Sequence, residues 1–107
     1  MSVKLLDTYN EMIIEKMAQF TTDCHNGQNL DVLKYGTVEG ICEELGEVIR
    51  ADRELKNLYS TDKDCTQDNL LEELGDLIFN ISLFAANRGI NLDTILEDNL
   101  TKIKRRG

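Results

Sequence analysis

Two short acidic clusters constrain this chain more than any other feature of its sequence. They read EELGE at residues 43–47 and EELGD at residues 72–76, and each places one carboxylate three residues after another. Both lie in segments whose apolar residues recur every three to four positions, which is the spacing of an amphipathic α-helix. Two such helices packed together would bring four carboxylates to one place, where they would repel one another unless a cation bound them. Hard oxygen ligands in that number favour Mg²⁺, with Mn²⁺ as an alternative.

The composition indicates a single all-helical domain spanning residues 1–107, because proline is absent and Leu, Ile, Glu and Asp are abundant. A net charge of −8 argues against binding to nucleic-acid polymers or to anionic membranes. No apolar stretch approaches the roughly 18–20 residues of a membrane span, and the first residues do not resemble a signal peptide. The three cysteines are odd in number and lack a metal-type spacing. We therefore expect a cytoplasmic protein with reduced thiols.

Capping residues and apolar spacing predict four helices. The first covers residues 3–20 and precedes a polar loop at 21–29, in which the single histidine, His25, is incidental. A short helical turn follows at 30–35. The second helix runs from its cap Thr37 to about residue 58, and the third runs from its cap Thr66 to about residue 88, before Gly89. The fourth begins after Asn91 and ends in a cluster of basic residues.

Helical geometry separates the acids that flank the apolar stripes from those that point further outward. Glu43 and Glu72 lie further round their helices and are candidates for an outer shell of residues around the ligands of a metal site. The acids beside the stripes, which would form the metal site, are Glu44, Glu47, Glu73 and Asp76. Exposed helix surfaces also carry many glutamates, so a solvated acidic face stays open as the alternative.

The second and third helices each carry an apolar stripe along one side, and Gly40 and Ala51 on the flank of the second would let a helix or a ligand approach closely. The segment LIFNISLFAA at residues 77–86 is apolar nearly all round, which indicates burial on nearly every side. Four short helices cannot cover it, so we expect self-association through these helices, as a homodimer or homotetramer. The two stripes consist of Val38, Ile41, Leu45, Val48 and Ile49, and of Leu70, Leu71, Leu74, Leu77, Ile78, Ile81 and Ala85.

Positive charge is concentrated at the end of the fourth helix, in Lys102, Lys104, Arg105 and Arg106. Cations at a helix C-terminus complement the helix dipole, which is one explanation. The other is that Lys102 and one of the two arginines hold phosphate oxygens.

The pattern EELGE, then 25 residues, then ELGD resembles the paired acidic signature of the MazG-like, all-α nucleoside triphosphate pyrophosphohydrolases. The similarity continues through ELGDLIFNISLFAANRGINLDTILEDNLTKIKRR and covers about residues 35–106. It implies an all-α, four-helix MazG-like bundle completed by homo-oligomerisation. It also implies Mg²⁺-dependent hydrolysis of a nucleoside triphosphate, with a dNTP favoured, to the monophosphate and pyrophosphate.

The resemblance also implies roles for individual residues. Glu44 or Glu47 would take the proton of the attacking water, and Glu43 would support the ligands or bind a further ion. Asn80 would contact the sugar or base, and Arg50 departs from the family pattern by placing a positive charge near Glu47. The residues that would bind the metal are Glu44, Glu47, Glu73 and Asp76, and those that would bind the phosphates are Lys102, Arg105 and Arg106.

Two alternatives remain open at this point. A phosphoribosyl-ATP pyrophosphohydrolase-like enzyme has a similar ending, but its corresponding helix reads ADLLYH where this chain has GDLIFN, so Asn80 stands in place of a histidine. The chain could also be a non-enzymatic helical dimer or adaptor whose acids are surface charge. A di-iron carboxylate bundle is excluded, because it needs more than one histidine.

Overall fold

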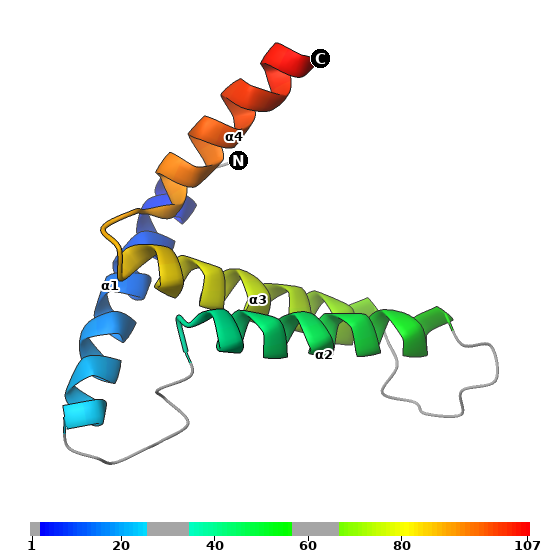
Figure 1. Cartoon of the computed structure of the whole chain (residues 1–107), viewed down its shortest axis with the longest axis horizontal. Helices are drawn as coiled ribbons and strands as arrows, with labels where there is room; N and C mark the ends of the chain where they lie inside the picture. The colour runs from blue at the N-terminus through cyan, green and yellow to red at the C-terminus, as the bar shows by residue number, and fades with distance from the viewer. Residues whose placement is uncertain (1–2, 26–34, 57–66) are drawn as a thin grey trace.

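The computed structural model describes residues 3–25, 35–56 and 67–107, and all regular structure in these ranges is helical. α1 spans Val3–His25, α2 spans Val38–Lys56, α3 spans Gln67–Ala86 and α4 spans Leu92–Arg106. α2 and α3 lie side by side, α1 crosses the end of α3, and α4 projects away from that pair (Figure 1). The predicted all-α class and the four helices are confirmed. Within the described ranges, no helix has the length and apolar character that crossing a bilayer requires.

α1 is longer than predicted, because it continues through residues assigned to a polar loop. The hydroxyl of Thr21 donates to the carbonyl of Met17 at 2.9 Å, and that of Thr22 donates to the carbonyl of Ala18 at 3.1 Å. These bonds satisfy the threonine side chains inside the helix, so the polar residues do not end it. His25 consequently ends α1 instead of lying in a loop. The predicted turn at 30–35, apart from Tyr35, and the cap Thr66 lie outside the described residues.

The helix ends follow the predicted capping residues. Gly40 N donates to the hydroxyl of Thr37 at 3.0 Å, and Thr94 N donates to Oδ1 of Asn91 at 2.9 Å, so both predicted N-caps are confirmed. α3 ends at Ala86, two residues earlier than expected. Gly89 then adopts a φ of 73°, and the amide of Ile90 donates to the carbonyl of Ala85 at 3.0 Å, which is the Schellman pattern that closes a helix.

Small residues allow α2 to approach α3 closely. Gly40 and Ala51 are buried, as their positions on the flank of the helix predicted. At the start of α2, Gly36 has a φ of 75°, and a Cβ at this residue would lie 3.1 Å from the side chains of Asn87 and Leu83. The backbone of this turn therefore presses directly on α3.

One buried polar side chain ties that turn to α3. Asn80 is only 1% exposed, and its Oδ1 accepts a hydrogen bond of 3.1 Å from Gly36 N. Its Nδ2 donates to the carbonyl of Asp76, one turn earlier, at 3.4 Å. Asn80 thus supplies the acceptor that an otherwise unpaired backbone amide needs where α2 begins.

The apolar core is small and lies where α1 crosses α3. Ile13, Leu83 and Ala85 are all at most 5% exposed. Beside them, the rings of Phe20, Tyr35 and Phe79 form a cluster with centroids 5.3–6.5 Å apart. This cluster joins α1 to α3 and to the turn before α2.

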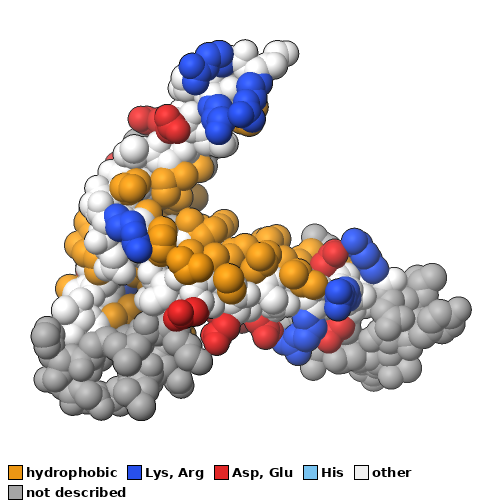
Figure 2. Space-filling view, in the orientation of Figure 1, with side chains coloured by type: hydrophobic (Ala, Val, Ile, Leu, Met, Phe, Trp, Pro, Cys, Tyr) orange, Lys and Arg blue, Asp and Glu red, His pale blue; other side chains and the backbone are white. Residues whose placement is uncertain are grey.

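Half of the residues in the two apolar stripes are exposed within one chain, whereas Ala85 is buried. Leu45 and Ile49 of α2 are each 46% exposed, and Leu71 of α3 is 68% exposed. The reason is that α2 and α3 meet through the flank that carries the small residues, which turns the large apolar side chains outward. Figure 2 shows them as a continuous hydrophobic band along α2 and α3, on the side that faces α4.

α4 does not close a bundle with the other helices of the same chain. It makes its main contacts with α1, where Asn10 Nδ2 donates to Oδ1 of Asp93, and none of its residues is buried. The radius of gyration is 16.4 Å, against about 13 Å for a compact chain of this length. The four predicted helices are therefore present in an open arrangement.

Replacing Asn80 tests how α2 is held on α3. Asn80→Ala should lower the free energy of unfolding by about 1–3 kcal/mol, because it leaves Gly36 N–H buried without an acceptor. Urea unfolding followed by circular dichroism measures the change. Asn99→Ala, at an exposed position on α4, is the control and should change the midpoint little. Equal effects of the two substitutions would contradict this role for Asn80.

Candidate metal centre

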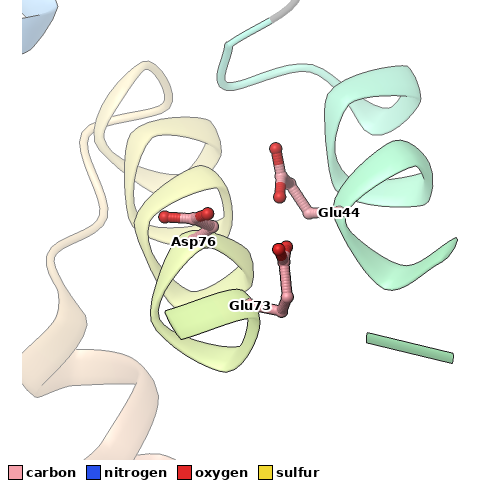
Figure 3. A group of neighbouring side chains, drawn as sticks. All are labelled: Glu44, Glu73 and Asp76. Carbon is pink, nitrogen blue, oxygen red and sulfur yellow. The ribbon is translucent and has the colours of Figure 1, made fainter. Parts of the chain in front are cut away.

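The two acidic clusters face each other across the contact between α2 and α3. Glu44 extends from α2, and Glu73 and Asp76 extend from α3, with the three carboxylates pointing toward one another (Figure 3). One oxygen from each of these carboxylates lies within 4.8 Å of the other two. This arrangement results from the close approach of the helices, since Gly40 and Ala51 are buried at either end of the same flank of α2.

Glu47, the fourth acid predicted for this site, is not part of the group of three. Its carboxylate accepts a hydrogen bond from the guanidinium of Arg50, one turn later on α2. Both side chains are substantially exposed, at 43% for Glu47 and 64% for Arg50. The sequence placed Arg50 near the site by its spacing, and the structure identifies it as the residue to which Glu47 is paired.

The three carboxylates repel one another. Partial burial raises the pKa of Glu44, and the charges of Asp76 and Glu73 raise it further. Burial and the charge of Asp76 likewise raise the pKa of Glu73, while Arg50 opposes this shift. The positive charge of Arg50 therefore offsets only part of the repulsion.

The group has the chemistry and spacing of a divalent-ion site. Mg²⁺ binds oxygen ligands at about 2.0–2.1 Å, so ligand atoms on opposite sides of one ion are about 4 Å apart. The three carboxylate oxygens lie within 4.8 Å of one another, which small side-chain adjustments would bring to that distance. Carboxylates are the hard ligands that Mg²⁺ and Mn²⁺ prefer. The residues present fit such an ion.

The other predicted site residues lie in different places. Glu43 and Glu72 are exposed and outside the group of three. Asn80 is buried and bonded to backbone atoms, so its predicted contact with a sugar or base stays a prediction. The basic residues lie at the exposed end of α4, which points away from α2 and α3 (Figure 2); they are Lys102, Arg105 and Arg106.

Tyr9 of α1 is a neighbour of the site that was not among the predicted site residues. Its side chain shares a hydrogen bond with Ser82. Burial raises the pKa of Tyr9, and the charge of Asp76 contributes to this shift. Tyr9 lies 67 positions from Asp76 in the sequence, and helical spacing gave no signal that α1 would cross α3 at this point.

Neutralising one carboxylate should relieve the repulsion. Because the pKa of Glu44 is raised above its ordinary 4.5, the folded chain binds more protons than the unfolded chain just above that pH. Stability contributed by this group is therefore lost as the pH rises through the raised pKa. With a chelator present at pH 7, Glu44→Gln should raise the melting temperature by on the order of 1–4 °C and flatten its dependence on pH. Calorimetric scans from pH 4 to 8 test this.

Glu97→Gln, on the exposed surface of α4, is the matched control and should leave the pH profile of the wild-type chain unchanged. Identical profiles for Glu44→Gln and the wild type would contradict the repulsion between Glu44 and the acids of α3.

Comparison with known proteins agrees with this geometry. A search of curated proteins and a search of solved structures each gave no match. The sequence model described as MazG nucleotide pyrophosphohydrolase domain matches residues 34–107, a range that includes α2, α3, α4 and both acidic clusters. The resemblance read from the two acidic motifs is thereby confirmed. This chain belongs to the family of the MazG nucleotide pyrophosphohydrolase domain.

Proposed function

We propose that this chain is a Mg²⁺-dependent nucleoside triphosphate pyrophosphohydrolase that produces a nucleoside monophosphate and pyrophosphate. A dNTP is the favoured substrate, and the reaction is placed in the cytoplasm. The observation that carries the proposal is the convergence of Glu44, Glu73 and Asp76 from two helices onto one point. Membership in the MazG family supports the reaction type.

In this proposal the three carboxylates hold the ion, and Glu47 joins them when it leaves Arg50. A bound Mg²⁺ neutralises charge on phosphate oxygens and lowers the pKa of a coordinated water. Glu44 or Glu47 would accept the proton of the water whose oxygen attacks the α-phosphorus, and pyrophosphate would leave with the bridging oxygen. Glu43 supports these ligands or binds a further ion, and Mn²⁺ would be an alternative to Mg²⁺.

Self-association is the second part of the proposal. Exposed apolar side chains are present on α4 as well as in the apolar band on α2 and α3, and among them Leu100 is 55% and Ile103 is 53% exposed. Burying such a surface against a second copy is favourable by about 25 cal/mol for each Å² removed from water. We propose a homodimer or a homotetramer in which this band is the contact surface.

A second copy would also explain how the basic end of α4 could serve the site. Within one chain, α4 points away from α2 and α3 and makes its main contacts with α1. In the proposed assembly, Lys102 and Arg105 or Arg106 reach the substrate phosphates bound to the other copy. Arginine would hold two phosphate oxygens as a fork, and lysine would act as a point charge.

The phosphoribosyl-ATP pyrophosphohydrolase-like alternative is less well supported. The residue that stands in place of its histidine is Asn80, which is buried and bonded to Gly36. A non-enzymatic helical adaptor remains the alternative of a different class, and the absence of hydrolysis would favour it.

Pyrophosphate release from a panel of NTPs and dNTPs is the direct test. With Mg²⁺, at least one nucleotide should be hydrolysed, and a chelator should abolish the reaction. Asp76→Ala and Glu47→Ala should each lower kcat/KM by about 10²-fold or more, because each removes a carboxylate from the metal site. Glu97→Ala, far along α4, should retain activity. If the folded wild-type chain hydrolyses no nucleotide, the enzymatic proposal is wrong.

Mixing two inactive variants tests whether the basic residues act across subunits. One variant carries Asp76→Ala, and the other carries Lys102→Ala, Arg105→Ala and Arg106→Ala. In a two-fold heterodimer one site then holds both sets of changes and the other holds neither, so random pairing restores about a quarter of the wild-type activity. Co-expression with two different tags, followed by the pyrophosphate assay, measures the recovery. No recovery in a verified heterodimer would contradict the shared site.

A further inference from the structure

We propose that Arg50 competes with the divalent ion for the carboxylate of Glu47 and thereby sets how tightly the ion binds. This inference rests on the proposed metal site and adds to it a positioning residue outside the ligand set. Glu47 is the one acid of the predicted four whose carboxylate is paired with a cationic side chain and not grouped with the other three. In the proposed competition, Glu47 exchanges the guanidinium for the ion when it becomes a ligand.

The charges near Arg50 lower the free energy needed for this exchange. Besides Glu47, Arg50 experiences the negative charge of Glu54, one turn further along the helix, and that of Glu73 on α3. A guanidinium released by Glu47 therefore still has a carboxylate within reach on its own helix, because residues four apart on a helix are neighbours. Glu47 can move toward the ion without leaving Arg50 in an uncompensated position.

Competition predicts the direction in which the affinity for the ion changes when Arg50 is replaced. In this competition, an ion that binds Glu47 displaces Arg50 from it. The binding free energy of the ion is therefore weakened by the free energy of the Glu47–Arg50 ion pair. Exposed ion pairs are weak, so removing the guanidinium should tighten ion binding by a moderate factor of about two- to fivefold. Removing a positive charge near a cation site would also tighten binding by general electrostatics, so the test must separate the two effects.

A double-mutant cycle makes this separation. Mg²⁺ binding to the full chain, stripped of metal and dialysed at low ionic strength, is measured by titration calorimetry in four proteins: the wild type, Arg50→Gln, Glu47→Gln and the double variant. Arg50→Gln should lower the Kd for Mg²⁺ about two- to fivefold. In the Glu47→Gln background, the same substitution should change the Kd by less than about 1.5-fold, because its target carboxylate is gone.

Two further variants refine the result. Arg50→Lys keeps a cation that can pair with Glu47 and should return the Kd to near the wild-type value. Lys56→Gln is the matched control, since Lys56 forms a comparable exposed ion pair with Asp52 at 2.9 Å on the same helix. It removes the same charge further from the carboxylates and should leave the Kd unchanged.

The outcomes are distinguishable. An equal tightening by Arg50→Gln in both backgrounds would overturn the competition and leave only general electrostatics. An unchanged or raised Kd in Arg50→Gln would also overturn it, while the metal site itself would stand. If the wild type binds no Mg²⁺, or if Glu44→Gln and Asp76→Asn do not weaken binding, then the metal site of the proposed function fails and this inference fails with it.

Discussion

The close packing of α2 on α3 is the constraint on which the rest of the structure depends. Gly40 and Ala51 are small and buried at either end of the flank of α2 that carries Glu44, so the two helices approach closely there. The turn before α2 is fixed by Asn80, which accepts from Gly36 N, and by the positive φ of Gly36. Because this contact sets the register of the two helices, it also sets which acids meet.

The same contact brings like charges together. Glu44 and Glu73, which are partly buried, converge with the exposed Asp76, and desolvation and mutual repulsion raise the pKa of Glu44 and of Glu73. Without a cation, such a group of carboxylates does not stabilise the folded chain, because its charges repel one another. A divalent cation bound among the three carboxylates would relieve their repulsion. The arrangement therefore supports a metal-dependent reaction in a family of pyrophosphohydrolases.

The helix contact also explains the open shape. α2 meets α3 through the flank that carries Gly40 and Ala51, and large apolar side chains of both helices lie exposed on the side toward the angle that α4 makes with them (Figure 2). Many large apolar side chains of the described helices therefore remain exposed within one chain. In our proposal a second copy removes this surface from water and brings the basic end of α4 to the carboxylates.

Local patterns in the sequence determined a good part of this protein. Apolar spacing predicted four helices, Thr37 and Asn91 marked two helix starts, and Gly89 marked the end of α3, because capping depends on residues only a few positions apart. The paired motifs selected four acids, of which Glu44, Glu73 and Asp76 converge and Glu47 does not, and they indicated the family. Thr21 and Thr22 were misassigned to a loop, since their hydroxyls bond within the helix.

Only the tertiary structure decided which face of each helix is used. Helical spacing identifies an apolar stripe but not the neighbour it meets, and within one chain half of the stripe residues of α2 and α3 are exposed while Ala85 is buried. It also could not show that Glu47 pairs with Arg50 or that Asn80 is buried under Gly36, because both depend on how side chains and helices sit in space. The sequence by itself determined the helices and the acids, and the packing of the helices decided how these acids are arranged.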